Sequence, residues 1–126
     1  MKTIIQTPKS PAPIGPYNQA IMVDNTLYAS GQIALDPKTM ELVNRDIETE
    51  TTQVMKNLSE VLKAAGMDFA NVVKTTIFLY DMGDFNAVNK VYGNYFNHKV
   101  APARETVQVA ALPKNVRVEI SVIAIR

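Results

Sequence analysis

Cysteine is absent from the 126-residue chain, and the only histidine is His98. The absence of cysteine excludes disulfides, thiol nucleophiles, iron–sulfur clusters and every zinc site that needs a thiolate ligand. A single histidine cannot build a site with several histidine ligands, nor a histidine pair that shares acid and base roles within one chain. His98 follows the end of an expected helix and fits a surface position there. We therefore expect no metal site.

Long apolar runs are missing too. The longest wholly apolar stretches, such as Val122 to Ile125, span a few residues, whereas a membrane-spanning helix needs about 20. The segment from Met1 to Lys9 is too short and too polar for the apolar part of a signal peptide. We expect a soluble protein in the cytoplasm, without a membrane partner, and the lack of cysteine fits that compartment.

The chain also has no excess of positive or negative charge and no cluster of glycines. Lys and Arg number 13, Asp and Glu number 12, and the net charge of +1 gives no indication of a nucleic-acid partner. The 5 glycines lie far apart, so no phosphate-binding loop is present. With 47% hydrophobic and 20% charged residues, the composition is that of a globular protein. The length predicts a single domain over residues 1–126.

The clearest predicted element is a helix from Asp46 to Ala65. Asp46 can cap its N-terminus and Gly66 can end it. Its apolar side chains recur at spacings of three and four, which places them on one face. A second helix is predicted from Asp84 to Phe96. Strands are predicted at Gln19–Val23, Leu27–Ser30, Val72–Tyr80, Arg104–Val109 and Val116–Ile125. This order predicts an α+β fold with two helices on one face of a mixed sheet.

The N-terminal segment from Lys9 to Pro16 is rich in proline and predicts an extended, ordered strap. Its PxxP spacing is an alternative sign of a ligand for another protein. In the last strand, Val118, Ile120, Val122 and Ala124 alternate with Arg117, Glu119, Ser121, Ile123 and Ile125. Two helices cannot cover both faces, so we expect a second copy of the chain to cover the second face.

One pair of charged residues stands out as a candidate site. Arg104 begins a strand after the small residues Ala101 and Ala103, and Arg suits a two-pronged grip on a carboxylate. Glu119 lies on the partly polar face of the last strand, where it could hold or activate a water molecule. The alternative is that both are surface charges or a structural ion pair.

The chain resembles the RidA/YjgF family of reactive-intermediate (enamine/imine) deaminases. The matching motifs follow one another over almost the full length. They are Ala12-Pro13-Ile14-Gly15-Pro16-Tyr17 with Gln19-Ala20, Ser30-Gly31-Gln32, Gln53 with Leu58 and Ala65-Gly66, Val73-Lys74-Thr75-Thr76, Asp81-Met82, Phe85 with Val88-Asn89 and Tyr92, Pro102-Ala103-Arg104, and Leu112-Pro113 through Val118-Glu119-Ile120.

The resemblance implies a chorismate-mutase-like α+β fold and a homotrimer with ligand clefts between subunits. It implies hydrolysis of 2-iminobutanoate and 2-iminopropanoate, released by pyridoxal-phosphate-dependent dehydratases, to 2-oxo acids and ammonia, without a metal or organic cofactor. It further implies that Arg104 binds the substrate carboxylate, that Glu119 positions the attacking water, and that the cleft is lined by Tyr17, Ser30, Gly31, Asn89 and the backbone around Thr106.

The motif departs from many relatives at one position. Glu105 and Thr106 follow Arg104, where a small Ser and then a Cys or Thr are common. Strand alternation points Glu105 away from the face of Arg104, so we expect it to leave the guanidinium free. Three other functions stay open: a non-catalytic regulator that binds small carboxylates in the same cleft, an RNA-acting protein, and a chorismate-mutase-like enzyme suggested by the fold alone.

Overall fold

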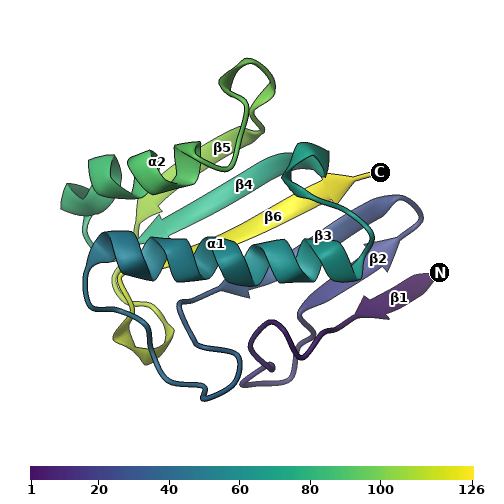
Figure 1. Ribbon diagram of the computed structural model, residues 1–126, viewed down its shortest axis with the longest axis horizontal. Helices are drawn as coiled ribbons and strands as arrows, with labels where there is room; N and C mark the ends of the chain where they lie inside the picture. The colour runs from purple at the N-terminus through teal and green to yellow at the C-terminus, as the bar shows by residue number, and fades with distance from the viewer.

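The computed structural model describes residues 1–126 and shows a six-stranded sheet with two α-helices in front of it (Figure 1). The helices are α1 (Ile47–Ala64) and α2 (Phe85–Gly93). The strands are β1 (Lys2–Ile5), β2 (Ala20–Val23), β3 (Thr26–Gln32), β4 (Val72–Leu79), β5 (Ala103–Gln108) and β6 (Val118–Ile125). The predicted α+β architecture is confirmed.

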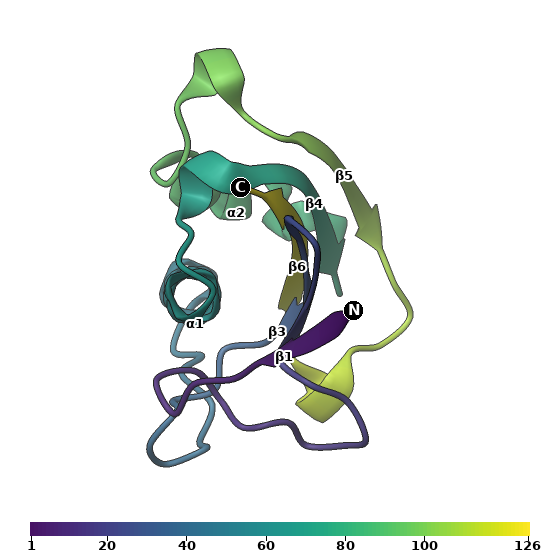
Figure 2. The same cartoon turned by 90° about the vertical axis from the view of Figure 1, so that its right-hand side faces the viewer.

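The strands are ordered β1-β2-β3-β6-β4-β5, so β1 and β5 form the two edges of the sheet. All neighbouring strands run antiparallel except β4 and β5, which are parallel. The return from β4 to the parallel β5 passes through α2, as a parallel connection requires. Figure 2 shows how strongly the sheet curves, with α1 packed against one side of it.

Helix α1 begins and ends where its sequence predicts. The carboxylate of Asp46 accepts a 2.7 Å hydrogen bond from the backbone N–H of Thr49. Gly66, just beyond the helix, has a φ of +72°, a conformation that glycine adopts without strain. The buried face of α1 packs on β3 and β6 and supplies much of the core through Val54, Met55, Leu58, Val61 and Leu62.

The predicted strand ends are wrong by one or two residues, since β3 extends to Gln32 and β6 begins at Val118. Two elements differ more from the prediction. Helix α2 ends at Gly93, and Phe96 lies beyond it, where its ring packs 5.3 Å from that of Phe69 and 4.7 Å from that of Tyr92. Phe96 thus makes its aromatic contacts from the segment after the helix rather than from the helix itself. Strand β1 was not predicted, because its four residues are largely exposed and their strand geometry comes from pairing with β2.

The last strand divides the sheet into a covered face and an open face. Val118, Ile120, Val122 and Ala124 are at most 3% exposed under the helices, as predicted. The opposite face carries apolar side chains that no helix covers, including Tyr28 at 50%, Val107 at 41% and Ile125 at 46% exposure. No helix in the chain has the length and apolar character needed to cross a membrane.

A buried amide network holds the N-terminal strap against the sheet. Gln19 is 3% exposed, and its side-chain N–H groups donate to the backbone oxygens of Thr7, Ser10 and Pro11. The hydroxyl of Ser10 in turn donates to the backbone oxygen of Asn57 in α1 at 3.1 Å. Because buried polar groups are costly unless they are paired, this network fixes the path of the strap toward Tyr17.

Candidate active site

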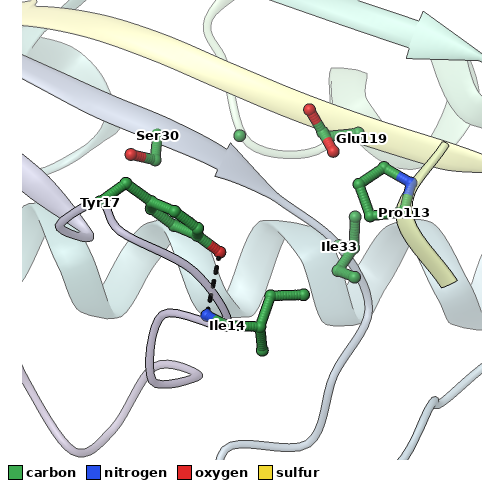
Figure 3. Close-up of a pocket in the computed structure, with 7 residues that line it drawn as sticks. Ile14, Tyr17, Ser30, Ile33, Pro113 and Glu119 are labelled. Atoms are coloured by element: carbon green, nitrogen blue, oxygen red, sulfur yellow. Dashed lines mark hydrogen bonds between the residues drawn. The ribbon is translucent and has the colours of Figure 1, made fainter.

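A pocket of about 360 Å³ opens where the strap passes strands β3 and β6 (Figure 3). It brings together four of the predicted site residues, Tyr17, Ser30, Gly31 and Glu119. Its remaining lining is apolar and was not predicted: Ile14, Ile33 and Pro113. Charged, hydroxyl and apolar groups therefore converge on one concave space, as is usual for small-molecule sites.

Glu119 is the one ionisable carboxyl in this pocket. Its side chain has no hydrogen bond and no ion pair within the chain. Burial raises the pKa of Glu119, because a desolvated carboxylate is disfavoured relative to the neutral acid. An unpartnered carboxyl with a raised pKa is suited to accepting and returning a proton.

Gly31 gives Glu119 the space for this position. A Cβ atom at residue 31 would lie 2.8 Å from Cδ and 2.9 Å from Cγ of Glu119. Those separations are shorter than side-chain carbons tolerate, so any larger residue would displace the carboxyl group. The glycine in the Ser30-Gly31 pair is therefore required by the close approach of the carboxyl group.

Hydrogen bonds orient the polar groups opposite Glu119. The hydroxyl of Ser30 donates to the backbone oxygen of Asn18 at 2.6 Å, which leaves its lone pairs free to accept. The phenol oxygen of Tyr17 accepts a hydrogen bond from the backbone N–H of Ile14 at 3.3 Å, drawn as the dashed line in Figure 3. Tyr17 is 45% exposed, so its ring forms an open rim of the pocket.

Arg104 lies outside this pocket, on edge strand β5 beneath helix α2. Its Nη1 donates a 2.7 Å hydrogen bond to Oδ1 of Asn89. The guanidinium carbon lies 5.8 Å from the ring centre of Phe85 and 5.0 Å from that of Tyr92. None of the ion pairs in the chain includes Arg104. A partly buried cation without an anion is a good receptor for an anionic ligand.

Thr106 adds a second unsatisfied group on the same strand. Residues 104 and 106 lie on one face of β5. Their register partners on β4 are Thr75 and Ile77, so this is the face of the sheet that the helices cover. The Thr106 hydroxyl oxygen is buried without a hydrogen-bond partner in the chain. Because such atoms are rare in folded proteins, an unpaired hydroxyl on the same strand face as a guanidinium without a counter-ion indicates a place for a polar ligand.

The structure does not bring Arg104 and Glu119 together within one chain. Arg104 pairs in register with Thr75, whose hydroxyl contacts Tyr92 of α2 on the helix face. Glu119 alternates with Val118 and Ile120, which are buried under the helices, so it lies on the open face. The predicted site residues thus form two half-sites on opposite faces of the sheet.

Glu105 turns away from Arg104, as strand alternation predicts. Its carboxylate pairs with Nζ of Lys74 at 3.0 Å and accepts a hydrogen bond from the hydroxyl of Thr76. These two contacts lower the pKa of Glu105 and keep it ionised on the open face. No group of three His, Cys, Asp or Glu side chains comes together in the chain to form a metal site.

Comparison with known proteins identifies the family. The profile of the family described as Endoribonuclease L-PSP matches residues 7–126. The human protein named 2-iminobutanoate/2-iminopropanoate deaminase is 52% identical over 126 residues, covering 100% of this chain and 91% of its own length. The chain belongs to the RidA/YjgF/L-PSP family.

Solved structures of the family match the fold closely. The Rid family protein YyfA from Yersinia pestis superposes with a TM-score of 0.96 at 48% identity. The alignment covers 100% of this chain and 100% of YyfA. RidA from the Antarctic bacterium Psychrobacter gives a TM-score of 0.94 at 43% identity over 98% of this chain and 99% of its own. The α+β fold of this chain, with its six-stranded mixed sheet and two helices, therefore matches solved structures of the RidA/YjgF family.

Some residues around the half-sites of this family member were not predicted from the sequence. Phe85 and Tyr92 were named only as motif residues, with no role of their own, although both rings lie against the guanidinium of Arg104. Their spacing around Asn89 places all three on one helix face, which is the signal that could have found them. Nothing in the spacing of Ile14, Ile33 and Pro113 indicates a shared pocket.

Replacing Gly31 with alanine should lower the activity of this RidA-family protein sharply without unfolding it. The added methyl carbon would lie 2.8 Å from Cδ of Glu119, so the carboxyl group would have to move away from its present position. Such a misplacement costs roughly 100-fold in rate when the group takes part in the chemistry. The measurement is kcat/KM for imine hydrolysis, with thermal unfolding of the same sample.

The matched control is Gly93→Ala. A Cβ at residue 93 would meet its nearest atom, Nε2 of His98, at an ordinary 3.4 Å. Because alanine is the better helix former, this control should keep full activity and gain about 0.5 kcal/mol of stability. Equal activity of the two alanine variants would contradict the role given to Gly31.

Proposed function

We propose that this chain hydrolyses 2-iminobutanoate and 2-iminopropanoate, the substrates named for its human relative, to 2-oxo acids and ammonia. The observation that carries the proposal is the pair of unpartnered charges, the Arg104 guanidinium and the Glu119 carboxyl. An imino acid offers a complement to each of them. Its carboxylate suits Arg104, and its electrophilic C=N carbon needs a water molecule held by a base.

The proposed chemistry proceeds in two steps. Water attacks C2 of the protonated imine, the C–O bond forms, and the electron pair of the C=N bond moves to nitrogen, while the Glu119 carboxylate takes a proton from the water. The resulting carbinolamine then receives a proton on nitrogen from Glu119. Ammonia leaves as the C=O bond forms, the hydroxyl group of the carbinolamine gives its proton back to the Glu119 carboxylate, and that proton passes on to the released ammonia, which leaves as ammonium. Atoms and charge balance with water alone as co-reactant, so we expect no cofactor. General acid–base help and orientation supply the acceleration.

The remaining site residues have supporting roles in this proposal. The hydroxyl of Ser30 and the phenol of Tyr17 line the pocket beside Glu119 and hold the attacking water and the leaving amine. Gly31 leaves room for the carboxyl. The unpaired hydroxyl of Thr106 and the adjacent backbone receive the substrate next to Arg104. Asn89 borders the same cleft through its contact with Arg104.

The two half-sites need a second copy of the chain to meet. We infer a homotrimer, in which β5 of one copy lies beside the pocket around Glu119 of the next. Two features support it: the uncovered apolar open face, and the placement of Arg104 and Glu119 on opposite faces of the sheet. A contact between two different surfaces generates a ring when its rotation closes, and in the proposed three-membered ring the open face is buried at the centre.

Light scattering tests this assembly. At micromolar concentration the protein should have about three times the mass of one chain. Replacing Val107, which is 41% exposed on the open face, with Glu should weaken the assembly, because it places a charge in an apolar interface. A wild-type monomer at that concentration would contradict both the shared cleft and the cover of the open face.

A coupled assay tests the activity. Threonine dehydratase generates the enamine and imine of 2-oxobutanoate, and the release of 2-oxobutanoate and ammonia is followed with and without this protein. The proposal requires faster release than with the dehydratase alone, and the acceleration should survive a chelator. Tight binding of 2-oxobutanoate without acceleration would favour the regulator instead.

The description of the family profile supports one second candidate, an RNA-cleaving activity. The net charge of +1 and the single histidine give it little physical basis. Incubation with labelled single-stranded RNA separates the two, and we expect no cleavage. A single domain over residues 1–126 and a cytoplasmic location stay predictions.

A further inference from the structure

One face of helix α2 forms a cradle for the guanidinium of Arg104. The cradle consists of Phe85, Asn89 and Tyr92, spaced four and three residues apart, so that all three point in the same direction. Phe85 and Tyr92 place their rings 5.8 and 5.0 Å from the guanidinium carbon. Between them, Oδ1 of Asn89 accepts the 2.7 Å hydrogen bond from Nη1. Three residues of one helix thus restrain one side chain of a neighbouring strand.

The hydrogen bonds of Arg104 leave one edge of its fork unused. Nη1 is engaged by Asn89, whereas Nε and Nη2 have no partner in the chain. A carboxylate binds two guanidinium N–H groups side by side, and the free Nε–Nη2 edge offers that geometry. The acceptor at residue 89 is a neutral amide, so it orients the guanidinium without neutralising its charge.

The ring of Tyr92 is itself fixed in place. Its hydroxyl lies 2.8 Å from Oγ1 of Thr75, and the two residues are 7% and 0% exposed. Thr75 is the register partner of Arg104 across the β4–β5 pair. The ring is therefore anchored to the strand next to the side chain that it supports. Burial also raises the pKa of Tyr92, so the phenol stays neutral at pH 7.

We propose that Asn89 and Tyr92 are positioning residues, which hold the guanidinium of Arg104 with its Nε–Nη2 edge free for the carboxylate of the substrate. The inference rests on the proposed imine hydrolysis and deepens it. A free arginine side chain samples many rotamers and loses that freedom on binding a ligand. A restrained arginine has lost it already, and the substrate binds more tightly as a result.

The sharpest test replaces Asn89 with Asp. The new side chain has the same size and still accepts from Nη1, but its charge neutralises Arg104 and competes with the carboxylate of the substrate. We expect KM, and the Kd of 2-oxobutanoate measured by calorimetry, to rise tenfold or more, with little change in kcat or Tm. The matched control is Asn86→Asp, which adds the same charge at an exposed position of the same helix; it should bind 2-oxobutanoate like the wild type.

The role of Tyr92 is tested with a pair of variants. Tyr92→Phe keeps the aromatic face and should keep KM near the wild-type value, although the lost contact with Thr75 lowers Tm. Tyr92→Leu removes the face and should raise KM by about 2- to 30-fold, the range of a cation–π contact. Val61→Ala, which opens a cavity in the core away from Arg104, lowers Tm as well and should leave KM unchanged.

The outcomes separate this inference from the proposed function. A wild-type protein that binds 2-oxobutanoate without accelerating imine hydrolysis contradicts the proposed function. The Kd values of the variants for 2-oxobutanoate then still test the cradle around Arg104. Equal Kd values for Asn89→Asp and Asn86→Asp, or equal KM values for the Phe and Leu variants of Tyr92, overturn the positioning roles. Wild-type protein that accelerates imine hydrolysis but fails to bind 2-oxobutanoate overturns the carboxylate grip of Arg104 and leaves the proposed function standing.

Discussion

Glu119→Gln should lower kcat/KM for 2-iminobutanoate hydrolysis by about 100- to 10,000-fold, the usual contribution of a positioned acid–base group. Glutamine keeps the size of the side chain and fits beside Gly31, but it cannot take a proton from water. Because the carboxyl of Glu119 has no hydrogen-bond or ion-pair partner in the chain, its replacement leaves no buried charge behind. Tm and oligomer mass should stay at their wild-type values.

The pH dependence of the wild type gives an independent test of Glu119. The base form of a carboxyl group is the deprotonated one, and burial raises the pKa of Glu119. Activity should therefore rise with pH through that raised pKa and level off above it, with the acid limb displaced upward from the range of an ordinary glutamate. The limb should vanish in Glu119→Gln. A variant that keeps both the rate and the limb would show that Glu119 is not the base.

Arg104→Ala should lower kcat/KM by about 30-fold or more. Removing one partner of a buried charge pair costs roughly 2–5 kcal/mol, and about 1.4 kcal/mol corresponds to a tenfold change. Arg104→Lys should also be damaging, because lysine keeps the charge but loses the planar fork and the hydrogen bond to Asn89. Imine hydrolysis and thermal unfolding are measured on the same samples.

The two explanations of Arg104 predict opposite patterns. A ligand-binding arginine loses activity on replacement while Tm and assembly persist. A structural arginine loses Tm or assembly and keeps near-normal activity per folded protein. Within the chain Arg104 forms no ion pair and only one side-chain hydrogen bond, which favours the first pattern. An Arg104→Ala protein as active as the wild type would remove the main support for a carboxylate grip.

Much of the fold could be predicted from sequence because its signals are local. Asp46 and Gly66 delimit α1 by their own side-chain and backbone chemistry, and the alternation from Val118 to Ile125 divides β6 into its two faces. Strand β1 carries no such signal, since only its pairing with β2 makes it a strand. The end of α2 was also missed, because the packing of Phe96 on Phe69 and Tyr92 continues the apolar pattern past the helix.

The candidate site could be predicted only in part. Residue type and strand alternation indicate Arg104 and Glu119, and the resemblance to the RidA/YjgF family supplies their roles. The unpaired state of each charge depends on which groups fail to reach it in space, and no local pattern contains that information. The contact between the ring of Tyr92 on α2 and Arg104 on the edge strand β5 is likewise a contact in space that no local pattern contains.

The division of the site between two faces of the sheet has a genetic consequence. In the proposed ring, each cleft takes Glu119 from one chain and Arg104 from its neighbour, so no isolated chain contains a complete active site. Two alleles that are each inactive, one lacking Arg104 and the other lacking Glu119, should complement when they are expressed together. Every ring that contains both kinds of chain holds a junction where an intact Glu119 faces an intact Arg104, and activity returns there.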